Sequence, residues 1–129
     1  MSHPNEDLLR RGYEAFGSGD MATLNELFSD DIVWHVGGRN PLSGDYEGKD
    51  AVFGFFAKTM ETTGGSFRLE LHDMLANDDH GIGLLVARGE REGKTLEDRG
   101  VQVLHFKDGK ATESWFHPGD AYAVDEFWS

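Results

Sequence analysis

The sequence predicts an α+β protein in which three N-terminal helices pack on one antiparallel sheet. Up to about residue 62, apolar residues recur at helical spacing. After Gly64-Gly65 the spacing changes to two, which is typical of strands. Short turns separate the strand-like segments, and this favours antiparallel neighbours. The 129 residues suit one domain, and because no linker or repeat divides them we expect a single domain over 1–129.

The caps define the first two helices. Asn5 or Asp7 is expected to cap the first helix, and Gly17–Gly19 to end it. Asp20 predicts the N-terminus of a short second helix. The apolar face of the first helix is carried by Leu8, Leu9, Gly12, Tyr13 and Phe16.

A short strand is expected at Ile32–Val36, followed by a loop over 37–48 and a third helix over 49–62 with a wide aromatic stripe. Four longer strands follow. We place them at about 67–72, 80–89, 95–106 and 110–117, with Asp108-Gly109 as a hairpin turn. The tail from Gly119 is assigned neither helix nor strand.

The middle strands are apolar on both faces. Ile82, Leu84 and Val86 share one face, while Leu85 and Ala87 lie on the other. Helices on one side of an antiparallel sheet leave its second face to water, and that face is then normally polar. We therefore expect a homodimer that packs sheet to sheet about a two-fold axis.

Composition excludes several classes of partner. Lys and Arg number 12 against 24 Asp and Glu, which gives a net charge of −12 and argues against nucleic acid and anionic membranes. Cysteine is absent, so disulfides and cysteine metal sites are excluded. No apolar run is long enough to span a bilayer, and the polar N-terminus is unlike a signal peptide, so a cytoplasmic protein is expected.

Several short motifs occur in a recognisable order: Gly19-Asp20, 27–31 (LFSDD), 48–52 (GKDAV), 108–110 (DGK) and 113–115 (ESW). With the order of helices and strands, they resemble the SnoaL-like branch of the nuclear transport factor 2-like superfamily, which includes polyketide cyclases and ketosteroid isomerases. The resemblance implies a cone-shaped fold, in which a curved sheet wraps around three helices and leaves an apolar cavity open at one end.

The triad of ketosteroid isomerase is not preserved. That enzyme uses a carboxylate base together with a tyrosine and a protonated aspartic acid. Alignment of the motifs places these three groups on Val36, Gly12 and Leu104, which carry none of the required functions.

Other members of the superfamily place acids and bases elsewhere on the cone. Cyclases of the SnoaL type use an aspartic acid near the cavity, and the resemblance points to Asp120 as the catalytic candidate, with His117 beside it. The Asp/Arg/Asp arrangement of the epoxide hydrolases would need Asp98 and Arg99, but neighbours in a strand alternate, so only one of the two can face the cavity.

A set of core-facing residues is expected to contact a ligand. Tyr13 should bond either a backbone carbonyl or a ligand, and the amide of Gln102, which lies between apolar neighbours, must find a partner. For the aromatic members of the set, simple core filling is the alternative. The substrate-binding candidates are Tyr13, Phe16, Trp34, Val36, Phe53, Phe56, Met60, Gln102, Leu104 and Phe116.

No cofactor and no metal are expected, because His72-Asp73 and 78–80 suit a strand and a turn better than a ligand set. His35 should face away from Trp34. The sequence thus predicts an enzyme that transfers protons on a small hydrophobic ligand, as an isomerase, cyclase, dehydratase or hydrolase. A non-catalytic binding module and a purely structural dimer with a filled cone are the alternatives. The acidic surface disfavours anionic substrates.

Overall fold

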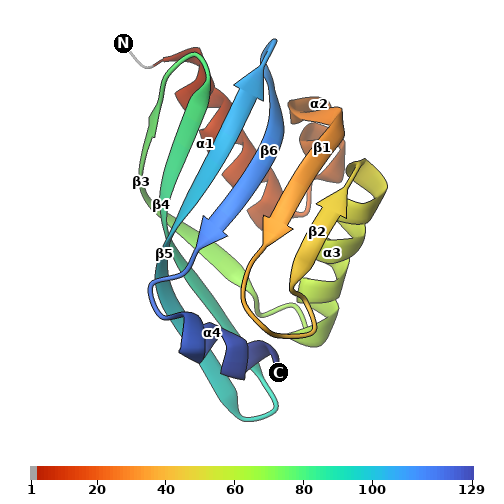
Figure 1. Cartoon of the computed structure of the whole chain (residues 1–129), viewed down its shortest axis with the longest axis vertical. Helices are drawn as coiled ribbons and strands as arrows, with labels where there is room; N and C mark the ends of the chain where they lie inside the picture. The colour runs from red at the N-terminus through yellow and green to blue at the C-terminus, as the bar shows by residue number, and fades with distance from the viewer. Residues whose placement is uncertain (1–2) are drawn as a thin grey trace.

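The computed structural model describes residues 3–129 and shows a curved sheet with helices packed on its concave side (Figure 1). This confirms the α+β class and the expected cone. In chain order the elements are α1 (Pro4–Ser18), α2 (Met21–Leu27), β1 (Phe28–Val36), β2 (Gly44–Glu47), α3 (Lys49–Thr62), β3 (Arg68–Ala76), β4 (His80–Arg91), β5 (Lys94–Lys107), β6 (Lys110–His117) and α4 (Ala121–Trp128).

The sheet differs from the expected one in its first two strands. Its order is β2-β1-β6-β5-β4-β3. Neighbouring strands are antiparallel except for β1 and β6, which run parallel. The short β2 lies in the segment expected to be a loop. Its four residues are mostly exposed, so they lack the alternation of apolar and polar residues that signals a strand.

The helix ends follow local chemistry. Asp20 caps α2 as predicted, since its carboxylate accepts the Thr23 N–H at 3.1 Å. Gly19 ends α1 as predicted, with a left-handed φ of 73°. The predicted cap of α1 is wrong, because the Nδ1 atom of His3 accepts the N–H of Asn5 and the helix begins at Pro4, before both expected caps.

The tail forms a helix that we did not predict. Asp120 caps α4 by accepting the Ala123 N–H at 3.1 Å. Phe127 and Trp128 on its inner side are buried against the sheet. In Figure 1, α4 lies at the same end of the molecule as the loop between β1 and β2.

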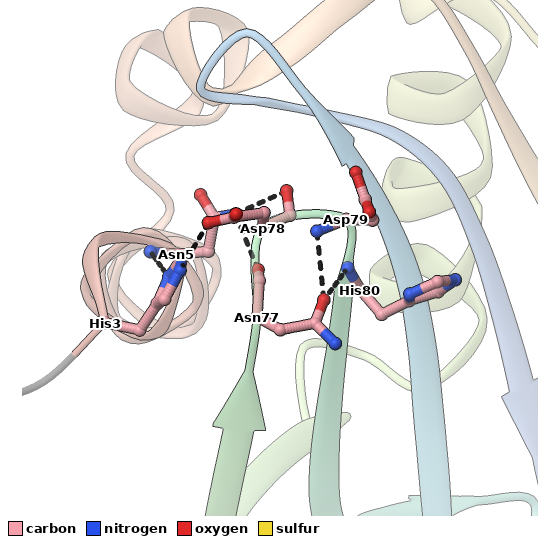
Figure 2. A network of polar contacts seen from close by, with 6 residues as sticks. All are labelled: His3, Asn5, Asn77, Asp78, Asp79 and His80. Atoms are coloured by element: carbon pink, nitrogen blue, oxygen red, sulfur yellow. Dashed lines mark hydrogen bonds and ion pairs between the residues drawn. The ribbon is translucent and has the colours of Figure 1, made fainter.

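A polar network fastens the opposite end (Figure 2). The buried Asn5 amide donates to the carbonyls of Asn77 and Asp78, at 2.9 and 3.1 Å. The His3 ring contacts the Asp78 carboxylate at 2.9 Å. Within the turn, the Asn77 side-chain oxygen accepts the N–H groups of Asp79 and His80. These bonds hold the start of α1 on the β3–β4 turn and give the turn residues a structural role.

The two sheet faces are covered differently. The inner face packs on α1, α2 and α3 around a core that includes Ile32, Val52 and Leu104. On the outer face, Ile82 and Leu75 expose 37% and 54% of their surface. The isolated chain therefore leaves apolar side chains of the outer face open to solvent.

Candidate functional site

A cavity of about 170 Å³ lies between the helices and the inner face of the sheet. Its walls come from α1, α2 and α3 on one side and from β1 and β3–β6 on the other. Among the lining residues, Gly37, Gly38 and Ala121 are exposed. The mouth therefore lies between the β1–β2 loop and α4, the end of the molecule opposite the network of Figure 2.

Most of the predicted ligand-contacting residues line this cavity, and two do not. The lining members are Tyr13, Phe16, Trp34, Val36, Phe56, Gln102, Leu104 and Phe116. Phe53 and Met60 are not among the lining residues. The residues of α3 that line the cavity are Phe55, Phe56 and Thr59. Because successive helical residues are rotated by about 100° about the helix axis, positions 53 and 60 lie to one side of that face. Phe53 instead packs on the ring of Phe28.

A chain of three side chains crosses the floor of the cavity. The Tyr13 hydroxyl donates to Gln102 Oε1 at 2.6 Å, and Gln102 Nε2 donates to Ser114 Oγ at 2.8 Å. A separation of 2.6 Å is usual for O–H···O and too short for N–H···O, so the amide oxygen is the atom that faces Tyr13. Tyr13 and Gln102, each expected to need a partner, thus satisfy one another.

The sheet makes room for this hydroxyl with a glycine. A Cβ atom at Gly83 in β4 would collide with the Tyr13 hydroxyl oxygen. Burial raises the pKa of the Tyr13 phenol, because the anion would lose its solvation. Tyr13 therefore keeps its proton, and that proton is engaged by Gln102.

The most deeply placed acid of the cavity is Asp98 in β5, which is 5% exposed. Its two carboxylate oxygens accept the N–H groups of Gly119 and Asp120, at 3.1 and 2.9 Å. We did not assign Asp98 to the site from the sequence. The signal was present, because Asp98 has the same strand parity as Gln102 and Leu104, both of which face inward.

The two residues predicted to be catalytic lie outside the cavity lining. His117 is exposed at the end of β6, where the inward position is taken by its neighbour Phe116. The Asp120 side chain is committed to capping α4, and the residue is exposed. The expectation that these side chains act at the cavity is therefore not supported by their positions, and Asp98 is the buried carboxylate of the cavity lining.

A second carboxylate, Asp125, lies at the mouth. It accepts the Asn40 side-chain N–H at 2.8 Å and the Arg39 backbone N–H at 2.9 Å, so it ties α4 to the β1–β2 loop. The hydrogen bond from Asn40, followed by that from Arg39, lowers the pKa of Asp125. Asn40 Oδ1 in turn accepts the Leu42 N–H.

The largest group of interacting titratable residues away from the cavity lies on the outer face. His35 contacts Glu113 through Nε2 at 2.6 Å and Asp45 through Nδ1 at 2.7 Å, and its ring stacks on Trp115. The hydrogen bond to Glu113, followed by that to Asp45, raises the pKa of His35. The prediction that His35 faces away from Trp34 and the cavity is confirmed.

The cavity is apolar and carries negative but no positive groups. Among the described residues that line it, Asp98 and Asp125 are the acids, and none is Lys, Arg or His. Within residues 3–129 no cluster of three or more His, Asp or Glu side chains is arranged to hold a metal ion. No helix in that same range has the length and apolar character needed to cross a membrane.

Comparisons with known proteins agree with the fold. Bal32a, from a soil-derived mobile gene cassette, is 42% identical and superimposes with a TM-score of 0.95 over 98% of this chain and 97% of its own. The polyketide cyclase candidate IdmH of Streptomyces antibioticus has the same fold at 23% identity, with a TM-score of 0.75 over 95% and 96% of the two chains. An uncharacterised protein of Mycobacterium bovis is 32% identical over 95% of both chains.

The family assignment rests on the match over most of the chain. The family model described as the SnoaL-like domain matches residues 9–114, which includes α1 except its first turn and all six strands except the end of β6. The motifs that suggested the resemblance lie within or next to the elements that build the cavity. This chain belongs to the SnoaL-like family and has the nuclear transport factor 2-like fold.

Proposed function

We propose that this protein binds a hydrophobic organic molecule in its cavity and transfers a proton on it, without a cofactor, as cyclases and isomerases do. The observation that carries the proposal is Asp98, a carboxylate buried in an apolar cavity with its oxygens held by two backbone N–H groups. A base fixed in this way is already oriented before the substrate arrives.

The rest of the cavity limits the chemistry. The proton of Tyr13 is donated to Gln102, so the tyrosine is not free to donate to an oxyanion. A substrate whose anion is stabilised by its own carbonyl groups suits such a site best. A 1,3-dicarbonyl compound meets this condition. In the proposed step its central C–H bond breaks, the proton passes to Asp98, and the electron pair is delocalised over the two carbonyl oxygens.

Support also comes from the family. IdmH, which shares the fold, is described as a polyketide cyclase candidate, and polyketides contain repeated 1,3-dicarbonyl units. The apolar wall and the absence of cations among the described lining residues suit a neutral substrate with an aromatic or alicyclic body.

Proton exchange into 1-phenyl-1,3-butanedione tests the base. In D₂O the wild type should speed deuterium exchange at the central carbon above the buffer rate, and Asp98→Asn should lose this acceleration. His117→Gln is the matched control and should exchange as the wild type does. Acceleration that survives Asp98→Asn, or that disappears in His117→Gln, would contradict the assignment and return it to the end of β6.

A non-catalytic binding module is the second candidate. The internal pairing of Tyr13 with Gln102 favours it, because polar groups that satisfy one another need no substrate to complete them. Saturable binding of the diketone without faster exchange in the wild type would select this alternative.

For the outer face we propose a homodimer packed sheet to sheet. Leu84, Val86, Val101 and Val103 form a half-buried apolar surface on the isolated chain, and Ile82 extends it. Analytical ultracentrifugation at micromolar concentration should give twice the chain mass of 14.4 kDa. Val103→Asp should give the single-chain mass with an unchanged circular dichroism spectrum. A 14.4 kDa wild-type species would contradict the proposal.

A further inference from the structure

We propose that the cavity selects apolar ligands that carry a hydrogen-bond donor, an O–H or a protonated amine, and rejects carboxylates of the same shape. This inference rests on the proposed function only in that the cavity binds a small molecule. It names the chemistry of the ligand, which that function leaves open.

The first step concerns the donors of the cavity. Tyr13 has one hydroxyl proton, and Gln102 receives it. The Thr59 hydroxyl donates to the Phe56 carbonyl at 2.7 Å. The amide groups of Gln102 and Asn40 each donate one hydrogen bond and accept one. The hydroxyl donors of the described lining side chains are therefore engaged within the protein, whereas Gln102 and Asn40 each keep a second N–H and Trp34 and Trp128 add indole N–H groups.

The second step concerns the acceptors, which keep spare capacity. Each oxygen of a carboxylate has two lone pairs, and each oxygen of Asp98 accepts one N–H, so both can accept again. The Tyr13 oxygen donates to Gln102 and retains its own lone pairs. A ligand that donates a hydrogen bond, including the enol O–H of a 1,3-dicarbonyl compound, therefore meets the Asp98 carboxylate as a partner.

The third step concerns charge. Asp98 lines the cavity wall and Asp125 lies at the mouth, and among the described lining residues no Lys, Arg or His balances them. The whole chain adds a net charge of −12. An anionic ligand would lose its hydration in this cavity and gain no cation, whereas an ammonium group would gain a carboxylate.

The size of the cavity decides which compounds can be used as test ligands. A cavity of about 170 Å³ is comparable to the engineered cavity of about 150 Å³ that holds benzene. A single ring with a short alkyl chain is therefore an appropriate ligand. Four matched compounds share this body: 4-propylphenol, 4-propylbenzylamine, 4-propylanisole and 4-propylbenzoate.

Isothermal titration calorimetry at pH 7 compares the four. We expect 4-propylphenol and 4-propylbenzylamine to bind at least tenfold more tightly than 4-propylanisole, and 4-propylbenzoate to bind most weakly. The phenol and the amine distinguish a neutral donor from a cation. If the amine binds more tightly than the phenol, charge dominates the selection. If the two bind equally tightly, the hydrogen bond dominates it. Both results support the proposal.

Substitutions in the cavity identify the residues that cause the preference for hydrogen-bond donors. Asp98→Asn replaces one acceptor by a donor and should reduce the preference for phenol over anisole to less than threefold. The double variant Tyr13→Phe with Gln102→Leu removes the tyrosine oxygen together with the amide oxygen that it would otherwise free, so it serves if Asp98→Asn fails to fold, and it should reduce the same preference. His72→Gln, on the exposed part of β3, should leave all four affinities unchanged.

The outcomes separate the two proposals. Anisole or benzoate binding as tightly as phenol in the wild type overturns the donor selection but leaves a ligand-binding cavity. An unaltered preference in both Asp98→Asn and the Tyr13→Phe, Gln102→Leu double variant also overturns it, because the selection would then lie elsewhere. If none of the four compounds binds, this inference fails, whereas the proposed function is decided separately by deuterium exchange into 1-phenyl-1,3-butanedione.

Discussion

Polar side chains on the two faces of the sheet have different surroundings, although residues of the two faces alternate along each strand. On the inner face, Gln102 and Asp98 are each 5% exposed and are paired with other side chains or with backbone N–H groups. On the outer face, His35 and Glu113 leave 24% and 32% of their side chains exposed and are joined by a contact of 2.6 Å. The inner polar groups are held rigidly in an apolar space, which suits recognition. The outer group lies open beside an apolar surface, which suits association and response to pH.

The largest expected effect concerns the support of Asp98 on the inner face. A Cβ atom at Gly119 would collide with the Arg99 backbone carbonyl, and it would displace the N–H that Asp98 accepts. Because backbone cannot move as a side chain can, Gly119→Ala should lower the free energy of unfolding by about 3 kcal/mol. Urea denaturation measures it.

A glycine in open space provides the control for this substitution. Gly17 in α1 has no atom within 4 Å of the position of its missing Cβ. Gly17→Ala should therefore raise the free energy of unfolding by about 0.8 kcal/mol, since alanine is the better helix former. Equal stability of Gly119→Ala and the wild type would show that Gly119, in the turn after β6, does not lie as close to the Arg99 backbone of β5 as described.

The second effect concerns the Tyr13–Gln102 pair. Tyr13→Phe leaves the buried Gln102 oxygen without its donor, and this should cost about 2 kcal/mol of unfolding free energy. The double variant Tyr13→Phe with Gln102→Leu removes the stranded oxygen as well. Its loss of unfolding free energy should be smaller than the sum of the losses in the two single variants. Strict additivity in chemical denaturation would mean that the two side chains do not depend on one another.

The smallest effect belongs to the outer face. The pKa of His35 is raised in the folded protein, so its protonated form is the one that folding favours. Its contribution is fully present below the ordinary histidine pKa of 6.5 and is lost as the pH rises through the raised folded value. Because the His35 side chain is partly exposed, its contribution to the free energy of unfolding is limited to about 0.5 kcal/mol.

Two variants isolate this pH dependence. His35→Gln should flatten the change of the thermal midpoint with pH across that interval, relative to the wild type. His72→Gln, at an exposed position of β3, should leave the wild-type slope unchanged. A slope that persists in His35→Gln would assign the titration to another group.

Periodicity and caps predicted most of the fold. Asp20 and Gly19 marked the break between α1 and α2, and the change of period after Gly65 marked the sheet. The parallel pairing of β1 with β6 was not predictable in this way, because register between strands far apart in sequence depends on how α3 packs. The fourth helix had a local signal, Asp120 followed by apolar residues at helical spacing, which we did not use.

The candidate site was predictable in its apolar wall and less so in its acid. Strand parity placed Gln102 and Leu104 inward, and the same parity applied to Asp98. Asp98 enters the sequence analysis only in the Asp/Arg/Asp arrangement, which the alternation of Asp98 and Arg99 weakens, whereas the resemblance points to Asp120, a residue whose carboxylate is taken by a helix cap. Which of several carboxylates reaches a cavity depends on the turn at Pro118-Gly119, and that turn is a tertiary feature.

A crystal structure of the wild type soaked with 4-propylphenol tests the central claim most directly. We expect the ring to lie in the cavity and the phenol hydroxyl to be within hydrogen-bond distance of Asp98 or Tyr13, with Tyr13 still donating to Gln102. A hydroxyl that points through the mouth to solvent, or a ring bound only on the outer face of the sheet, would contradict it.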